Sequence, residues 1–149
     1  MTILFDLQEH LMRAPAGELE GDVFLRPAGS VLFVEHMEGA RVVRVTHRSK
    51  PDAGVVFRAE RFLERGSDCR LVVTGRLNQL SVPPGAGAAL SVPGSEDVLA
   101  FLEPLSGLYS VSCLLDGAAR GGVLIAARKA GQPVGGFDFF VDGILVLAD

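Results

Sequence analysis

Short apolar runs in which every second residue is hydrophobic, separated by glycine and proline turns, constrain this chain most strongly. In the run at 69–77, Cys69 and Leu71 fall on one face, whereas Arg70 and Thr74 fall on the other. This alternation is typical of antiparallel strands that have one face in a core and the other in solvent. The sequence therefore predicts a mainly β protein.

Glycine and proline turn signals divide the chain into many such runs from residue 18 onward. The candidate strands are 19–26, 30–36, 40–48, 54–63, 69–77, 88–92, 108–115, 122–129, 134–141 and 144–148. Short strands at regular spacing predict an antiparallel β-sandwich or barrel of about 8–10 strands. Because 149 residues is a typical length for one domain, we expect a single domain over residues 1–149.

Two segments depart from the strand pattern. Residues 2–13 carry apolar side chains at a spacing of four, which predicts an N-terminal helix, with a strand at 2–7 as the alternative. A second, short helix is predicted near 96–103, where Ser95 can act as an N-cap and Pro104 ends the pattern.

The C-terminal third is apolar on both faces of its predicted strands. The runs 123–127, 137–141 and 144–148 carry few polar residues, so we expect a second sheet, the helix or another subunit to cover both faces. The pair Asp142-Gly143 between the last two runs is typical of a two-residue hairpin turn.

Charge is distributed unevenly along the chain. Residues 41–76 hold nine basic and four acidic residues, a balance of +5, whereas the rest holds five basic and fourteen acidic residues, a balance of −9. If strands 40–48, 54–63 and 69–77 pair as a meander, five arginines share one outer face. They are Arg44, Arg48, Arg58, Arg70 and Arg76. One interpretation of such a face is a site for an anionic partner. The alternatives are an ordinary solvated sheet face and a contact with the acidic part of an identical subunit.

The stretch from Leu77 to Ser95 has no charged residue. We interpret it as an arm that packs on a neighbouring molecule or closes over a ligand. Its candidate contact residues are Val82, Pro83, Pro84, Leu90 and Val92. The alternative is a short edge strand between two proline turns, packed on its own domain.

Motifs for catalysis, nucleotide binding and zinc binding are missing from the sequence. We therefore expect no catalytic residue, no metal and no cofactor, and we do not expect an enzyme. His36, His47 and Cys69 form the one grouping that could bind a soft metal, against the alternative of ordinary hydrogen-bonded histidines. Cys69 and Cys113 are expected to be buried thiols rather than a disulfide.

Aromatic side chains that stack on sugars or bases are scarce, because the chain has no tryptophan and one tyrosine. The apolar strands, the charge-free arm and the bipolar charge instead favour a non-catalytic protein-interaction or structural assembly subunit. Such a subunit forms a homo-oligomer or docks on a protein partner. The alternative is a small apolar-ligand carrier or sensor with a cavity inside a β-barrel.

The expected location is the cytoplasm, since the N-terminal residues do not resemble a secretory signal. We expect no membrane association, because no apolar stretch reaches the length of a span. The net charge of −4 disfavours a nucleic-acid partner.

Overall fold

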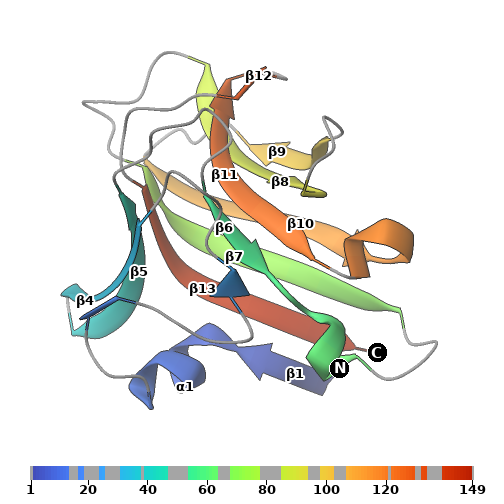
Figure 1. The fold of residues 1–149 in the computed structure, drawn as a ribbon, viewed down its shortest axis with the longest axis horizontal. Helices are drawn as coiled ribbons and strands as arrows, with labels where there is room; N and C mark the ends of the chain where they lie inside the picture. Colours follow the sequence, from blue (N-terminus) through green and yellow to red (C-terminus); the bar gives the residue numbers. More distant parts are fainter. Residues whose placement is uncertain are drawn as a thin grey trace.

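Two antiparallel β-sheets pack face to face in the computed structural model of the chain (Figure 1). The structure describes residues 2–13, 17–18, 24–25, 31–37, 39–46, 54–63, 68–77, 85–93, 98–102, 107–120, 122–129, 132–133 and 139–148. In chain order the elements are β1 (Thr2–Asp6), α1 (Leu7–Met12), β2 (Gly17–Glu18), β3 (Phe24–Leu25), β4 (Val31–Met37), β5 (Ala40–Thr46), β6 (Val55–Phe57), the 3-10 helix η1 (Glu60–Phe62), β7 (Cys69–Leu77), β8 (Ala86–Ser91), β9 (Val98–Leu102), β10 (Leu108–Leu115), the 3-10 helix η2 (Gly117–Arg120), β11 (Val123–Lys129), β12 (Gln132–Pro133) and β13 (Phe139–Ala148).

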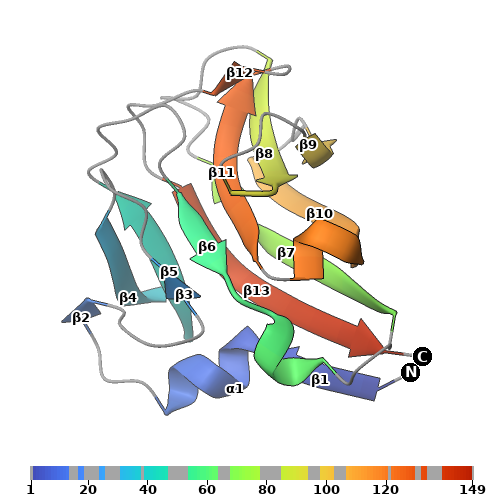
Figure 2. The same cartoon turned by 45° about the vertical axis from the view of Figure 1, so that its right-hand side comes forward.

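Sheet A has the strand order β10-β7-β13-β5-β4-β2, with β1 as a further partner of β13. Strand β13 is central, because it pairs with β7 along its whole length on one side. On the other side it pairs first with β5, over residues 139–141, and then with β1, over residues 145–148. Sheet B has the order β3-β6-β11-β8-β9, with β12 beside β11. Figure 2 shows sheet B lying over sheet A as the second layer.

The core fills the space between the two sheets. Its largest fully buried side chains include Phe139, Leu71 and Ile144 from sheet A, and Phe57 and Ile125 from sheet B. Each of these gains about 1.5–3 kcal/mol from leaving water. The alternation predicted for 69–77 is confirmed, because odd-numbered residues of β7 are buried and even-numbered ones are more exposed.

The predicted fold class is confirmed as a mainly β antiparallel sandwich with one α-helix. Of the two architectures expected, the closed barrel is absent from the described part of the chain, where both sheets are open. Nine of the described strands have five or more residues, in line with the number expected.

The short helix predicted near 96–103 is wrong, because Val98–Leu102 is strand β9. This segment pairs with β8 at the edge of sheet B. A short apolar run fits both a helix and a strand, and the neighbouring β8 supplies backbone partners that decide for the strand.

The N-terminal segment combines the two alternatives. Residues 2–6 form β1, so the predicted helix over 2–13 is wrong there, and only Leu7–Met12 are helical. Asp6 caps the helix, with its side chain accepting a hydrogen bond from the Gln8 amide at 3.0 Å. No helix in the described ranges is long and apolar enough to cross a membrane.

The hairpin predicted at Asp142-Gly143 is also wrong. Strand β13 runs without interruption from Phe139 to Ala148. The register with β7 shifts between Val141 and Gly143, so Asp142 is the extra residue of a β-bulge. Both halves of β13 stay paired to β7, which leaves no room for a chain reversal.

Candidate functional site

The outer face of sheet A, defined as the face directed away from sheet B, presents an aromatic side chain between two arginines. Phe139 and Val141 belong to the core, so Phe140 between them faces outward and is partly exposed. Phe140 is in register with Arg44 of β5 on one side and with Arg76 of β7 on the other. Adjacent strands lie about 4.8 Å apart. The three residues therefore form one row across three strands.

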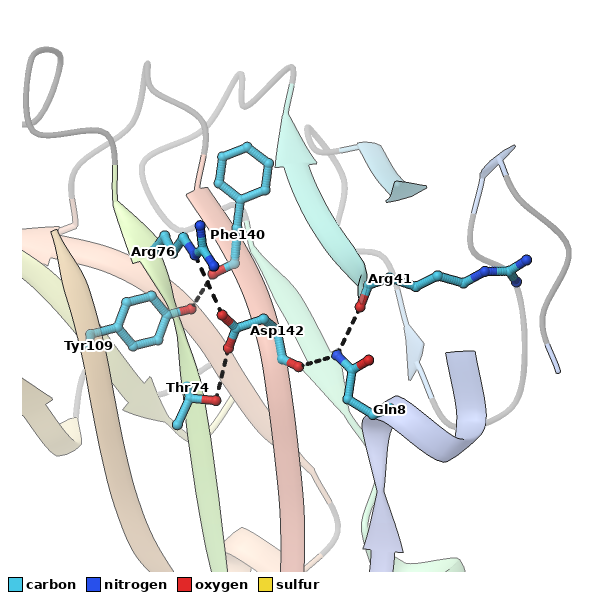
Figure 3. A network of polar contacts seen from close by, with 7 residues as sticks. All are labelled: Gln8, Arg41, Thr74, Arg76, Tyr109, Phe140 and Asp142. Atoms are coloured by element: carbon cyan, nitrogen blue, oxygen red, sulfur yellow. Dashed lines mark hydrogen bonds and ion pairs between the residues drawn. The ribbon is translucent and has the colours of Figure 1, made fainter. Parts of the chain in front are cut away.

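The bulge at Asp142 places a carboxylate beside this row (Figure 3). The Thr74 hydroxyl donates a hydrogen bond to Asp142 Oδ1 at 2.9 Å. Asp142 Oδ2 lies 3.7 Å from Nε of Arg76 in a half-buried ion pair. The bulge thus orients Arg76 and provides hydrogen-bond acceptors next to Phe140.

Tyr109 supports the same row from the core side. Its hydroxyl donates a hydrogen bond to the backbone oxygen of Phe140 at 2.6 Å. The phenol lies against Gly75, where an added Cβ would collide with the ring and with the Phe140 carbonyl. Burial, reinforced by the Asp142 carboxylate, raises the pKa of Tyr109, so the phenol stays protonated and able to donate. Tyr109 therefore holds the backbone of Phe140 in place.

Helix α1 closes the sheet at the point where β13 changes partner. The Gln8 side-chain amide donates to the backbone oxygens of Arg41, at 2.8 Å, and Asp142, at 2.5 Å. Arg41 in turn donates from Nη1 to the backbone oxygen of Leu11 at 2.9 Å. The two Gln8 bonds satisfy one carbonyl of β5 and one of β13 at the point where β13 leaves β5 (Figure 3).

Strand β10 extends the outer face beyond Arg76. Its exposed residues alternate along the strand as Leu108, Ser110, Ser112 and Leu114. Leu108 is in register with Arg76, and Leu114 lies six positions further along the strand, which corresponds to about 20 Å. Two hydroxyls therefore lie between two apolar side chains on an elongated surface.

The structure brings together only some of the five predicted arginines. Arg44 and Arg76 flank Phe140, and exposed Arg70 lies on the same face of β7, with its Nη1 3.4 Å from the Ser112 hydroxyl. Arg58 follows β6 in sheet B and forms an ion pair with Glu60 at 2.6 Å. Arg48 lies outside the described residues.

The predicted meander is therefore wrong. Strands β5 and β7 both pair with β13, and β6 lies in the other sheet. In a sandwich the chain crosses between layers, so strands that follow one another in sequence need not share a face. The C-terminal strand β13 takes the place that the meander assigned to 54–63.

The predicted arm does not form around Leu90. This residue is fully buried in the core on β8, an interior strand between β11 and β9, and Val92 packs against the same core. The lack of charge at 86–91 reflects burial inside sheet B rather than a docking arm or an edge strand. Val82, Pro83 and Pro84 lie outside the described residues.

The grouping of His36, His47 and Cys69, weighed above as a possible soft-metal site, has no geometric support. Cys69 is in the core, while His47 and the side chain of His36 lie outside the described part of the chain. Within that part, no three His, Cys, Asp or Glu side chains gather. Cys69 and Cys113 are free and buried, as expected. Burial, followed by the Asp116 carboxylate, raises the pKa of Cys113 to about 11, which makes it a poor nucleophile.

Sequence reasoning missed Phe140, Asp142, Thr74, Tyr109 and Gln8. The parity of the FDFFV run already separates Phe140 from its two buried neighbours. The register that places it between Arg44 and Arg76 depends on strand pairs that are far apart in sequence. No local pattern encodes such pairs.

The chain matches no protein-family model and no curated protein. Solved structures do share its fold. It is similar to the CBM22-2 xylan-binding domain of Xyn10C from Paenibacillus barcinonensis, with a TM-score of 0.61, 12% identity and coverage of 98% of this chain and 99% of that one. The CBM22-1 xylan-binding domain of the same protein gives a TM-score of 0.61 at 11% identity, with coverage of 99% and 94%.

A third similar structure is the CBM22-1–GH10 part of endo-1,4-β-D-xylanase 10B from Clostridium thermocellum, solved with xylohexaose. The TM-score is 0.61 at 17% identity, and the match covers 85% of this chain. The chain spans about a quarter of that larger protein, with 26% covered. At these identities the comparison shows the fold.

These neighbours correct the function predicted from sequence. They are described as xylan-binding domains, which contradicts both the protein-interaction or assembly subunit and the apolar-ligand carrier. The predicted homo-oligomer or protein partner is contradicted on the same ground. The sandwich of this chain is one that solved structures use to bind a carbohydrate.

Proposed function

We propose that this protein is a carbohydrate-binding domain that holds a polysaccharide chain on the outer face of sheet A. The observation that carries the proposal is the Arg44–Phe140–Arg76 row, with the Asp142 carboxylate beside it. The shared fold supports it, since the xylan-binding neighbours match almost the whole length of the chain.

The row suits the two surfaces of a sugar ring. A pyranose has an apolar face of C–H groups, which the ring of Phe140 can cover. Its edge carries hydroxyls, which accept hydrogen bonds from guanidinium groups and donate them to carboxylates. Arg44, Arg76 and Asp142 supply both kinds of partner around the ring. Ser110 and Ser112 offer further hydroxyls along the face.

The kinds of aromatic residue in the chain limit which side chains can stack on a sugar ring. The chain has no tryptophan, and its single tyrosine, Tyr109, is buried beneath the sheet. Among the side chains that the structure describes on the outer face of sheet A, Phe140 is the aromatic one, which makes it the stacking platform of the proposed site. We expect affinity to depend on this side chain more than on any other, as buried aromatic anchors dominate many interfaces.

The test is affinity electrophoresis in gels that contain soluble xylan or mixed-linkage glucan, followed by calorimetry with the polymer that retards the protein. Phe140→Ala is expected to weaken binding about tenfold or more, because truncating a central aromatic anchor costs about 2 kcal/mol. The matched control is Phe101→Ala, which removes a part-exposed phenylalanine from β9 of sheet B. The control should bind like the unsubstituted protein.

Two results contradict the proposal. One is the absence of retardation of the unsubstituted protein by any of a panel of plant and microbial polysaccharides. The other is an unchanged affinity in Phe140→Ala when circular dichroism shows that this variant is folded.

A further inference from the structure

We infer that the polysaccharide is anionic and carries carboxylate groups, as in a xylan substituted with uronic acid. The inference rests on the proposed function and specifies its ligand. It is carried by Arg44 and Arg76, which are in register with Phe140 on either side, one strand away in each direction. Guanidinium matches a carboxylate with two parallel hydrogen bonds, which makes it the preferred partner for this group in proteins.

The spacing suits a charged substituent on a stacked sugar. The Cα atoms of Arg44 and Arg76 are about 10 Å apart, two strand spacings across the sheet. A pyranose on the ring of Phe140 therefore has one cation on each side. A carboxylate that projects from the sugar meets an arginine in either orientation of the chain. Figure 3 shows the Arg76 guanidinium beside Phe140.

The arginines are oriented before any ligand arrives. Asp142 contacts Arg76 through Nε, and both Arg44 and Arg76 make further interactions within the chain. Their side chains are partly buried, so dissolved salt screens their charge less than it would screen a fully exposed charge. Ordered cations lose less conformational entropy on binding than mobile ones.

The experiment compares glucuronoxylan with the same polymer after its carboxyl groups have been reduced to alcohols. We expect about tenfold or tighter binding of the native polymer at low salt, a difference of about 1.4 kcal/mol, because reduction removes the charged acceptor of the guanidinium hydrogen bonds. The preference should shrink in 0.5 M sodium chloride, where the screening length is only a few ångströms.

Substitutions locate the effect. Arg44→Gln and Arg76→Gln should each lower affinity for native glucuronoxylan several-fold more than they lower affinity for the reduced polymer, because only the native polymer offers a carboxylate to the guanidinium. Arg58→Gln is the matched control, because Arg58 lies on sheet B, paired with Glu60. Thermal unfolding of every variant checks that each one is folded.

The possible outcomes distinguish the inferred anionic ligand from the proposed carbohydrate-binding function. Equal affinity for the native and reduced polymers overturns the anionic ligand and leaves carbohydrate binding intact. Binding of neither polymer, nor of any other polysaccharide, overturns the proposed function itself. Equally tight binding of polyglutamate that survives Phe140→Ala overturns the inference as well, because it would reveal a general anion surface without sugar recognition.

Discussion

At the scale of single residues, Gly75 and Tyr109 act as a pair. Gly75 lies on the core side of β7, where its neighbours Val73 and Leu77 are buried apolar residues. The missing side chain leaves the space that the Tyr109 phenol fills on its way to the Phe140 carbonyl. An internal glycine usually weakens a strand, and here that cost is offset by the ring above it.

Replacing Gly75 with alanine should therefore be severely destabilising, by about 3 kcal/mol or more, because both the Phe140 backbone and the tyrosine ring must move. Gly122→Ala is the matched control, since a Cβ there meets only Val56 at 3.5 Å and Phe57 at 3.7 Å. Urea denaturation of both variants measures the difference. Similar free energies of unfolding for the two would contradict this account of Gly75.

At the scale of elements, helix α1 covers the gap in sheet A between β5 and β1. Strand β13 leaves β5 after residue 141 and meets β1 from residue 145. Between these points the Gln8 side-chain amide donates to the Arg41 carbonyl of β5 and to the Asp142 carbonyl of β13. Asp6 ends β1 and caps the helix. A helix of six residues would not form alone in water, so its packing and these bonds hold it.

We expect Gln8→Glu to lower the free energy of unfolding by about 2 kcal/mol or more at pH 7. The carboxylate has the same shape but cannot donate, and it faces two carbonyl oxygens. Glu9→Gln, on the exposed side of the same helix, should change stability by less than about 1 kcal/mol. Chemical denaturation followed by circular dichroism tests both. An equal effect of the two substitutions would show that Gln8 does not join the strands.

At the scale of the whole molecule, an aromatic cluster connects α1, β1 and sheet B. The Phe5 ring lies 5.6 Å from the His10 ring, 5.1 Å from Phe57 and 4.7 Å from Phe62, measured between centroids. Burial lowers the pKa of His10 below its usual 6.5, so the folded protein favours the neutral imidazole. Protonation in this cluster opposes folding.

Stability should therefore depend on pH through His10. Because its folded pKa is the lower one, the unfolded chain binds more protons as pH falls through 6.5. The stabilising effect of the neutral ring is complete above that pH and is lost as pH drops through the folded pKa. The difference in unfolding free energy between the unsubstituted protein and His10→Gln should shrink from pH 7.5 to pH 5. A difference that stays constant, or grows toward acid, would contradict this prediction.

Much of the fold could be predicted from sequence, because the signal for a strand is local. The runs at 69–77 and 108–115 are strands with the same bounds in the structure. The errors lie where pairing overrides local preference. Residues 2–6 became a strand because β13 has an unfilled edge there, and Asp142-Gly143 became a bulge because β7 continues past it.

Sequence by itself determined the class of this protein, since alternation of apolar residues fixes which side chains each strand buries. It also located an excess of arginine between residues 41 and 76. Only the tertiary structure decided that two of these arginines, from β5 and β7, lie on either side of Phe140. The reason is physical: strand order and register depend on contacts between segments nearly a hundred residues apart, and no pattern within one segment records its neighbours.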